Sequence, residues 1–253
     1  MSANGDIPAI DVRSLTAGYE GHTVLEDISF TVRRGEVFVI LGGSGCGKST
    51  LLRHLVGLAP PISGTILING RDLTAASDSE REGILSGMGV LFQSGALFGS
   101  LSLADNIRFP LTEHAVLPAP VLETLAGMKL RLVGLEDCAL HMPGELSGGQ
   151  KKRGGLARAL ALEPEILFFD EPSAGLDPLT SATLDQTIVN LNRSLGLTIV
   201  VVTHELPSIF TIAHRVIMLD PQTKGIIAEG DPRELRDHST NDEVRRFLNR
   251  DGA

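Results

Sequence analysis

The chain has 253 residues, of which 42% are hydrophobic and 28 are glycine, and this composition is typical of an ordinary soluble α/β protein with a substantial core. Its 31 acidic residues outnumber the 22 basic ones, and the net charge of -9 argues against a general surface for nucleic acid or anionic lipid. No apolar run approaches the roughly 20 residues that span a bilayer, and residues 1–6 resemble no export signal. We therefore expect a cytoplasmic protein that meets membranes only through partners, with Cys46 and Cys138 as reduced thiols.

The first elements are predicted from short apolar runs and glycine turns. Runs of β-type residues at 9–12 and 28–32 predict a small antiparallel sheet. Residues 37–41 are almost all apolar, which indicates a strand buried on both faces. This strand leads into a glycine-rich loop and then into a helix predicted at 49–58.

Two more buried strands are predicted further along the chain, at 166–169 and 197–202. The first ends at Asp170, and the second ends near His204. Polar residues that follow the carboxyl ends of apolar strands are typical of a parallel α/β sheet. The predicted fold class is therefore α/β, with a parallel-sheet core and a small N-terminal antiparallel β subdomain.

We interpret 94–161 as an inserted helical subdomain, with helices predicted at 121–134 and from Ser147 onward. Three prolines are expected to break its early part: Pro110, Pro118 and Pro120.

The C-terminal part is expected to be helical. A helix start is predicted at Asp231-Pro232, because proline suits the first turn. Residues 242–250 indicate a short terminal helix, with three apolar residues on one face: Val244, Phe247 and Leu248. We interpret 1–253 as a single domain. Its parts are a core that includes the N-terminal sheet (1–93 and 162–225), the helical subdomain (94–161) and a C-terminal extension (226–253).

Residues 42–49 match the phosphate-binding pattern G-x-x-x-x-G-K-[ST]. The amides of this loop are expected to bind phosphate oxygens, and the helix that follows adds its partial positive charge. We expect Lys48 to neutralise the β- and γ-phosphates of ATP and Ser49 Oγ to bind Mg²⁺. The predicted ATP-binding residues of this region are Gly42, Gly43, Ser44, Gly45, Cys46, Gly47, Lys48, Ser49 and Thr50.

An acidic pair, Asp170-Glu171, follows four large apolar residues. Carboxylates in this position suit a magnesium site. We expect Asp170 to hold Mg²⁺ directly or through water, and Glu171 to polarise the attacking water.

A second glycine-rich loop, 146–150, offers another nest of backbone amides. One protomer has no use for two such sets around a single ATP. The sequence therefore predicts a homodimer, in which each ATP lies between the first loop of one protomer and the second loop of its partner.

From Tyr19 through His204 the chain resembles the ATP-binding-cassette (ABC) ATPases, a family of P-loop NTPases. The second loop carries the diagnostic Leu-Ser-Gly-Gly-Gln signature of that family in full, at 146–150. The resemblance implies that this loop contacts the γ-phosphate of ATP held by the other subunit. Its expected contact residues are Ser147, Gly148, Gly149 and Gln150.

The resemblance also assigns roles to isolated residues. Tyr19 matches the aromatic residue that stacks on adenine, and Gln93 matches the glutamine that senses magnesium and links the site to the transport partner. Asp177 matches the aspartate of a loop that crosses the dimer interface. His204 matches the switch histidine that contacts the γ-phosphate. The candidate catalytic residues are thus Glu171, His204 and Lys48, and the candidate metal-binding residues are Ser49, Gln93 and Asp170.

Lys151, Lys152 and Arg153 crowd the first turn of the helix after the signature, where each exposed cation opposes the helix dipole by ~0.3–1 kcal/mol. Two explanations stay open: a triphosphate bound in trans, and a solvated basic face. The next two residues, Gly154 and Gly155, predict close packing or local flexibility.

Cys46 lies beside Lys48 at a helix N-terminus, where the pKa of a thiol tends to fall. The sequence therefore predicts a reactive thiol that bound ATP shields from alkylation. The alternative is that cysteine is simply small enough for the loop.

The stretch 90–107 narrows the resemblance to the ATPase subunits of bacterial Mla-type phospholipid transport systems. Residues 117–120, 128–130 and 142–146 add to this likeness. The resemblance implies integral-membrane permease subunits, a lipid-binding MCE-domain protein and a small STAS-domain protein as partners. Its implied docking socket for the permease comprises Phe92, Phe98 and the segment 94–110.

Two other functions stay open at this point. The chain could serve an ABC transporter for a different solute, which would differ only in the permease it docks. It could also be a soluble cassette ATPase used as an assembly scaffold or in repair, although it lacks the long coiled-coil insertions typical of the repair members.

Overall fold

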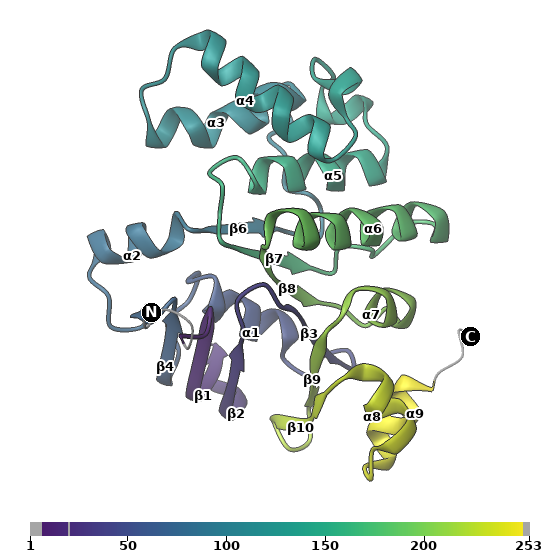
Figure 1. Ribbon diagram of the computed structural model, residues 1–253. Helices are drawn as coiled ribbons and strands as arrows, with labels where there is room; N and C mark the ends of the chain where they lie inside the picture. The colour runs from purple at the N-terminus through teal and green to yellow at the C-terminus, as the bar shows by residue number, and fades with distance from the viewer. Residues whose placement is uncertain (1–6, 20, 250–253) are drawn as a thin grey trace, which may run out of the picture.

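The computed structural model describes residues 7–19 and 21–249, and it places their strands in two sheets (Figure 1). The smaller, antiparallel sheet has the strand order β2-β1-β4-β5. Its first two strands confirm the predicted N-terminal sheet, whereas the other two were not predicted. The bounds are β1 Ile10–Tyr19, β2 His22–Val32, β4 Ser63–Ile68 and β5 Arg71–Asp72.

The larger sheet has the order β10-β9-β3-β8-β7-β6. All neighbours pair in parallel except β10, which runs antiparallel to β9 at one edge. The predicted parallel core is therefore confirmed. The bounds are β3 Val37–Gly42, β6 Met88–Leu91, β7 Ile166–Asp170, β8 Thr198–Val202, β9 Arg215–Asp220 and β10 Gly225–Gly230.

Strand β3 shows why its sequence is apolar at every position. Val37, Val39 and Leu41 belong to one core, shared with the helical part of the molecule. Phe38 and Ile40 point to a second core, shared with the N-terminal sheet. Side chains alternate across a strand, so a strand between two cores is apolar throughout.

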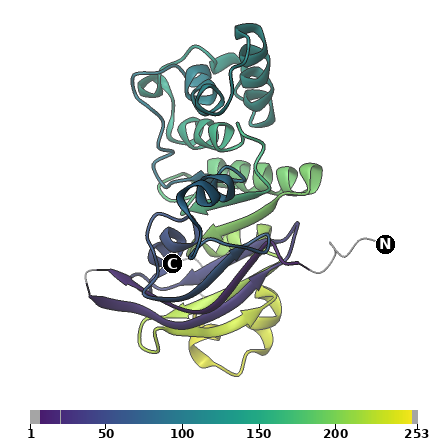
Figure 2. The ribbon, with the colours of Figure 1, turned by 90° about the vertical axis from the view of Figure 1, so that its left-hand side faces the viewer.

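Nine α-helices are recorded among the described residues. Figures 1 and 2 show α3, α4 and α5 gathered at one end of the molecule, beyond β6, while the N-terminal sheet and α1 lie toward the other end. The bounds are α1 Lys48–Leu55, α2 Asp78–Leu85, α3 Leu103–His114, α4 Ala119–Leu132, α5 Gly148–Ala159, α6 Pro178–Leu195, α7 Leu206–Ile212, α8 Pro232–His238 and α9 Asp242–Leu248.

The expectation that prolines break the early part of 94–161 is correct for Pro118, which lies between α3 and α4, and wrong for Pro110 and Pro120. Helix α3 runs through Pro110. Buried Ile107 and Leu111 lie on one face of the helix, before and after Pro110, and their packing against the core offsets the lost backbone hydrogen bond. Pro118 is the N-cap of α4, and Pro120 lies in its first turn, where a missing N–H costs little.

The C-terminal extension packs on its own chain. Asp231 caps α8, as predicted, and accepts hydrogen bonds from Arg233 N and Glu234 N. Val244 and Leu248 of α9 are buried in the core. The predicted end of this helix, residue 250, lies outside the described residues.

Candidate functional site

The first glycine-rich loop joins the end of β3 to the start of α1. Gly42 has φ 149° and an added Cβ would lie 2.5 Å from Leu219 O, so only glycine fits there. Lys48 Nζ folds back over the loop and donates to Gly42 O at 2.9 Å and to Gly43 O at 3.0 Å. The two carbonyls thus hold the Lys48 ammonium beside the glycine-rich loop. A cation next to the backbone amides of such a loop suits the binding of phosphate.

Cys46 differs from the sequence-based expectation. Its side chain is 1% exposed, and burial raises the pKa of the thiol although Lys48 lies close to it. Burial disfavours the thiolate more than the nearby ammonium favours it. The prediction of a lowered pKa is therefore wrong, and the observed role of Cys46 is to fill the space beneath the loop.

Asp170 is the last residue of β7 and Glu171 follows it; the neighbours of β7 in the sheet include β8. Asp170 Oδ1 and Glu171 Oε2 are buried, and no hydrogen-bond donor reaches them from the described residues. Burial raises the pKa of Asp170, and the charge of Glu171 adds to this effect. Two unsatisfied buried carboxylate oxygens beside the phosphate loop are what a bound Mg²⁺ with its waters would satisfy.

Two protein ligands are enough for such an ion. Within residues 7–19 and 21–249, no cluster of three or more His, Cys, Asp or Glu could hold a metal by itself. Mg²⁺ usually binds through one or two protein oxygens plus substrate phosphates and waters. Ser49 Oγ and Asp170 fit that requirement, and the ion would supply charge neutralisation at the phosphates.

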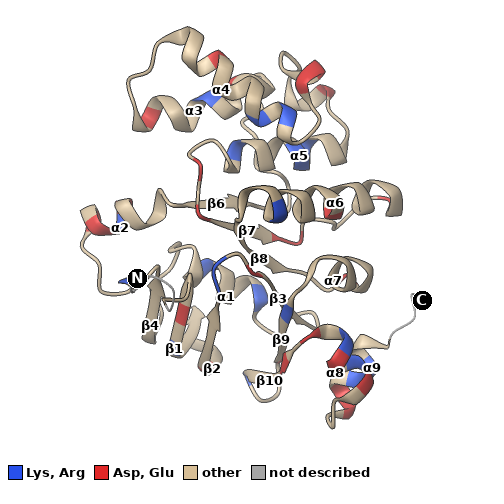
Figure 3. Ribbon diagram, in the orientation of Figure 1, with Lys and Arg blue, Asp and Glu red and all other residues tan. Residues whose placement is uncertain are grey.

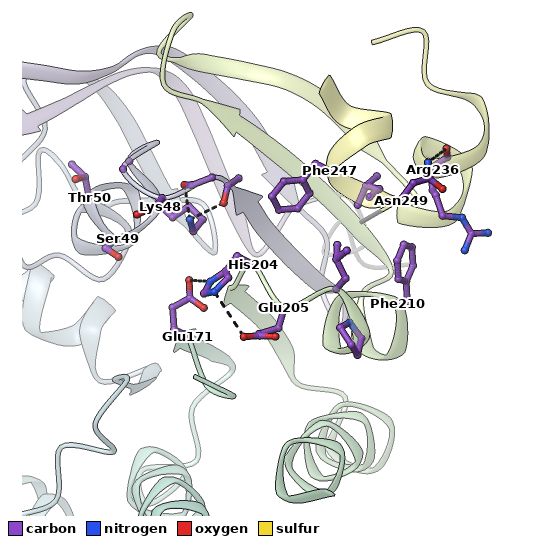
Figure 4. Close-up of a pocket in the computed structure, with 18 of the residues that line it drawn as sticks. Lys48, Ser49, Thr50, Glu171, His204, Glu205, Phe210, Arg236, Phe247 and Asn249 are labelled. Carbon is purple, nitrogen blue, oxygen red and sulfur yellow. Dashed lines mark hydrogen bonds and ion pairs between the residues drawn. The ribbon is translucent and has the colours of Figure 1, made fainter. Parts of the chain in front are cut away.

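Glu171 faces His204 across the end of the sheet (Figure 4). His204 Nδ1 lies 2.9 Å from Glu171 Oε1, and its Nε2 lies 3.8 Å from Glu205 Oε1. Glu171 has φ 46°, which is unusual for a residue with a side chain. A carboxylate that is carried by a strained backbone and held by a histidine suits a group that aligns a water molecule.

An open cleft of about 1580 Å³ brings many of the predicted residues together. Tyr19 lies on its rim and is 62% exposed, so it is not a core tyrosine. The predicted residues that line the cleft are Tyr19, Gly42, Gly43, Ser44, Gly45, Gly47, Lys48, Ser49, Thr50, Glu171 and His204. The predicted residues that do not line it are Cys46, Gln93, Asp170, Asp177 and those of the signature loop.

The opposite wall of the cleft was missed by the sequence analysis. Phe210 of α7 and Phe247 of α9 line it, together with Arg236 of α8 (Figure 4). The Arg236 guanidinium lies 5.3 Å from the centre of the Phe210 ring. No spacing pattern connects these residues to the phosphate loop, because only the order of the strands brings them near it.

The signature loop caps α5. Ser147 Oγ accepts from Gln150 N at 3.2 Å, and Ser147 N donates to Gln150 Oε1 at 2.8 Å, which is a capping box. A Cβ on Gly149 would lie 2.3 Å from Thr180 Cγ2, so glycine lets α5 approach α6. Asp177 caps α6, with its Oδ1 accepting from Thr180 N at 3.0 Å.

The basic residues 151–153 that follow the signature are not all exposed to solvent, and two of them donate hydrogen bonds to backbone carbonyls. Lys152 is 6% exposed and donates to backbone carbonyls, and Arg153 Nη1 donates to Val133 O at 2.9 Å. The explanation of a solvated basic face is therefore wrong for Lys152, while binding of a triphosphate in trans stays a hypothesis. The glycines pack closely: a Cβ on Gly154 would lie 2.6 Å from Leu103 Cδ1, and one on Gly155 would lie 2.5 Å from Gly95 O.

Comparisons with known proteins agree with this geometry. A family model described as "ABC transporter" matches residues 25–174. The chain is 43% identical over 240 residues to the "Intermembrane phospholipid transport system ATP-binding protein MlaF" of Escherichia coli (strain K12), covering 94% of this chain and 88% of that protein. It is 44% identical over 252 residues to the "Probable ribonucleotide transport ATP-binding protein mkl" of Mycobacterium leprae, covering 98% of this chain and 72% of that protein.

Solved structures agree as well. An ATP-binding cassette described as dimeric, in a post-hydrolysis state and bound to ADP and Pi, matches with a TM-score of 0.79 at 30% identity. The match covers 88% of this chain and 98% of that one. Together with the site, these findings confirm the predicted fold, and the chain is an ATP-hydrolysing member of the ABC transporter family, with ATP and Mg²⁺ as its cofactors.

Proposed function

We propose that two copies of this chain enclose two MgATP between them, with the signature loop of each copy closing the cleft of the other. One observation carries this proposal: the signature loop lies outside the cleft that its own chain forms around Lys48, Glu171 and His204. In this arrangement 1–93 and 162–225 bind nucleotide and 94–161 presents the signature.

The proposed roles are those that the family resemblance implies, and the geometry of the cleft supports several of them. Lys48 and the loop amides hold the phosphates, Ser49 and Asp170 hold Mg²⁺ with Gln93 as a further contact, and Tyr19 stacks on adenine. Glu171 accepts a proton from the attacking water, because its Oε2 is free of other donors among the described residues. His204 orients Glu171 and contacts the γ-phosphate.

We propose further that the dimer drives a phospholipid transporter. The support is the relative of Escherichia coli, whose name states that function and which the chain matches over 94% of its length. None of the helices that the structure describes combines the length and apolar character of a bilayer span. On this proposal the chain sits on the cytoplasmic face of the inner membrane under two permease subunits, with an MCE-domain protein and a small STAS-domain protein as further partners.

The proposed permease socket has an exposed aromatic pair. Phe98 and Phe109 are 45% and 42% exposed and meet edge to face, with ring centres 5.0 Å apart. Asn106, fully buried, accepts from Phe98 N at 2.7 Å and donates to Phe98 O at 3.1 Å. Arg158 donates to Ala96 O at 2.6 Å and lies over the Phe98 ring. An apolar pair held this rigidly suits a protein partner.

The dimer is tested with Glu171→Gln, which keeps the shape of the side chain and removes the base. We expect this variant to form dimers with MgATP and to return to monomers without it, as measured by light scattering after size-exclusion chromatography. A variant that stays monomeric at saturating MgATP, alone and with its membrane subunits, would refute the proposal.

The cargo is tested separately. The tagged chain is purified from a detergent extract, and the associated membrane subunit is identified and reconstituted with it in phospholipid vesicles. ATP-dependent movement of labelled phospholipid supports the proposal. Movement of a nucleotide instead would favour the second candidate, since the Mycobacterium leprae relative carries a ribonucleotide transport name.

A further inference from the structure

Helix α5 carries several cations, shown in blue in Figure 3, and one of them is buried. Lys152 is 6% exposed, and its Nζ donates to Ala174 O at 2.6 Å and to Glu171 O at 3.4 Å. Burial lowers the pKa of this ammonium, while the charge of Glu171 opposes the shift. A buried ammonium is costly unless its protons are donated, so this cation is committed to the backbone after β7.

The backbone that Lys152 holds is a tight turn. Ala174 N donates to Glu171 O at 3.2 Å, and Glu171 N donates to Val202 O at 2.8 Å. Glu171 itself adopts the left-handed region, with φ 46°, which is unfavourable for a residue with a Cβ. A strained turn persists only where its surroundings fix it. Lys152 is one of the groups that surround this turn, because it donates to carbonyls at both of its ends.

The same helix begins at the signature. Ser147 is the N-cap of α5, and five residues of helix place Lys152 about 7.5 Å further along. Gly149 fits against Thr180 of α6 with no room for a Cβ. A shift of the signature therefore moves the whole first turn of α5 and the ammonium with it.

We propose that Lys152 is a positioning residue that couples the two nucleotide sites of the dimer. It links the signature loop, which meets the partner's nucleotide, to Glu171, which acts on the nucleotide of its own chain. This inference rests on the dimer of the proposed function. When the signature loop docks on the partner's nucleotide, it determines the position of the Lys152 ammonium. The ammonium in turn determines the conformation of the turn that carries Glu171.

The test is Lys152→Met, which keeps the length of the side chain and removes its donors. We expect kcat for ATP hydrolysis to fall by about 10- to 100-fold, as expected for a displaced catalytic group, while KM for ATP stays within about twofold. The matched control is Lys129→Met. Lys129 is also buried, at 8% exposed, but its Nζ pairs with Glu163 Oε1 at 3.1 Å, away from this turn. The kcat of Lys129→Met should stay within about twofold of the wild-type value.

A second measurement separates this role from a contact with nucleotide in trans. In the Glu171→Gln background, Lys152→Met should form the MgATP dimer at the same ATP concentration as the background variant. A weaker dimer together with a raised KM would mean that Lys152 binds triphosphate, and it would overturn the inference. An unchanged kcat in Lys152→Met would overturn it too.

Lys152→Arg keeps a donating cation on a bulkier planar group and should retain more kcat than Lys152→Met. Equal losses of kcat in the Arg and Met variants, with unchanged melting temperatures, would show that packing alone matters and would refute the inference. If Lys152→Met does not fold, Lys152→Gln replaces it, because its shorter amide cannot reach Ala174 O. Failure of Glu171→Gln alone to dimerise refutes the proposed function instead, so the two failures are distinguishable.

Discussion

At the scale of single residues, Glu171 combines the features of a reactive group. Its backbone is strained, one carboxylate oxygen lies beside His204, and the other is buried with no donor among the described residues. Native structures satisfy nearly all buried polar groups. The exception at Glu171 is therefore the strongest structural sign of its chemical role.

Glu171→Gln is expected to lower kcat by about 10²- to 10⁴-fold, the usual contribution of a general base, and to leave ATP affinity nearly unchanged. The measurement compares steady-state hydrolysis with binding of a fluorescent ATP analogue. The control is Glu165→Gln, because Glu165 lies at the other end of β7 and pairs with Arg34 on the surface. Normal turnover by Glu171→Gln would remove this residue from the role of base.

Cys46 is expected to react slowly with alkylating reagents, because its raised pKa and burial leave little accessible thiolate. In a Cys138→Ser background, labelling by iodoacetamide at pH 8 should be at least about tenfold slower in the native chain than in urea. The rate should also change little on addition of MgATP. If the native chain were labelled fast and MgATP blocked this labelling, Cys46 would be the reactive thiol predicted from the sequence.

At the scale of elements, a buried contact joins α6 to α7, the helix that follows His204. Ser208 Oγ donates to Asp185 Oδ2 at 2.8 Å, while Asp185 Oδ1 has no donor among the described residues. Burial raises the pKa of Asp185, and the charge of Glu205 adds to this, while the Ser208 hydrogen bond opposes it. The folded protein thus holds this proton more tightly than the unfolded chain does.

The raised pKa of Asp185 makes the free energy of unfolding depend on pH in a defined direction. Because the unfolded chain binds fewer protons at Asp185, the free energy of unfolding falls as pH rises from about 3.9, the ordinary pKa, through the raised pKa of the folded state. Asp185→Asn removes that dependence. We expect its melting temperature to fall less between pH 4 and pH 8 than that of the wild type.

The control for this prediction is Asp137→Asn, which alters an exposed carboxylate. It should keep the wild-type difference in melting temperature between the two pH values. An identical pH dependence in Asp185→Asn and the wild type would contradict the raised pKa of Asp185.

At the scale of the whole molecule, the nucleotide cleft and the aromatic pair lie on different parts of the chain. The cleft is lined from the ends of β3, β7 and β8 and from α7, α8 and α9. Phe98 precedes α3, which lies in the helical part of the molecule (Figure 1). The proposed permease contact can therefore be broken without changing the nucleotide site.

Phe98→Asp is expected to abolish co-purification with the membrane subunits and to leave ATP binding by the isolated chain intact. A buried charge without a partner opposes docking. The control is Leu195→Asp, since Leu195 is 50% exposed at the end of α6. Intact assembly and transport with Phe98→Asp would place the permease elsewhere.

Much of the fold follows from local sequence. The strand, glycine loop and helix around Lys48 were predicted within a few residues of β3 and α1, because apolar runs and a phosphate-binding pattern are continuous in the chain. Strands β4, β5, β6, β9 and β10 were not predicted. All except β9 are short or partly exposed, whereas β9 contains a buried apolar run at 216–219 that the sequence analysis missed.

The sequence by itself determined the phosphate loop, the acidic end of β7, the signature and the family, because each of these is encoded by neighbouring residues. Only the tertiary structure decided the raised pKa of Cys46, the commitment of Lys152 to the turn at Glu171, the continuity of α3 through Pro110 and the C-terminal wall of the cleft. Each of these depends on desolvation or contact by groups distant in the chain, which the order β9-β3-β8-β7 brings together.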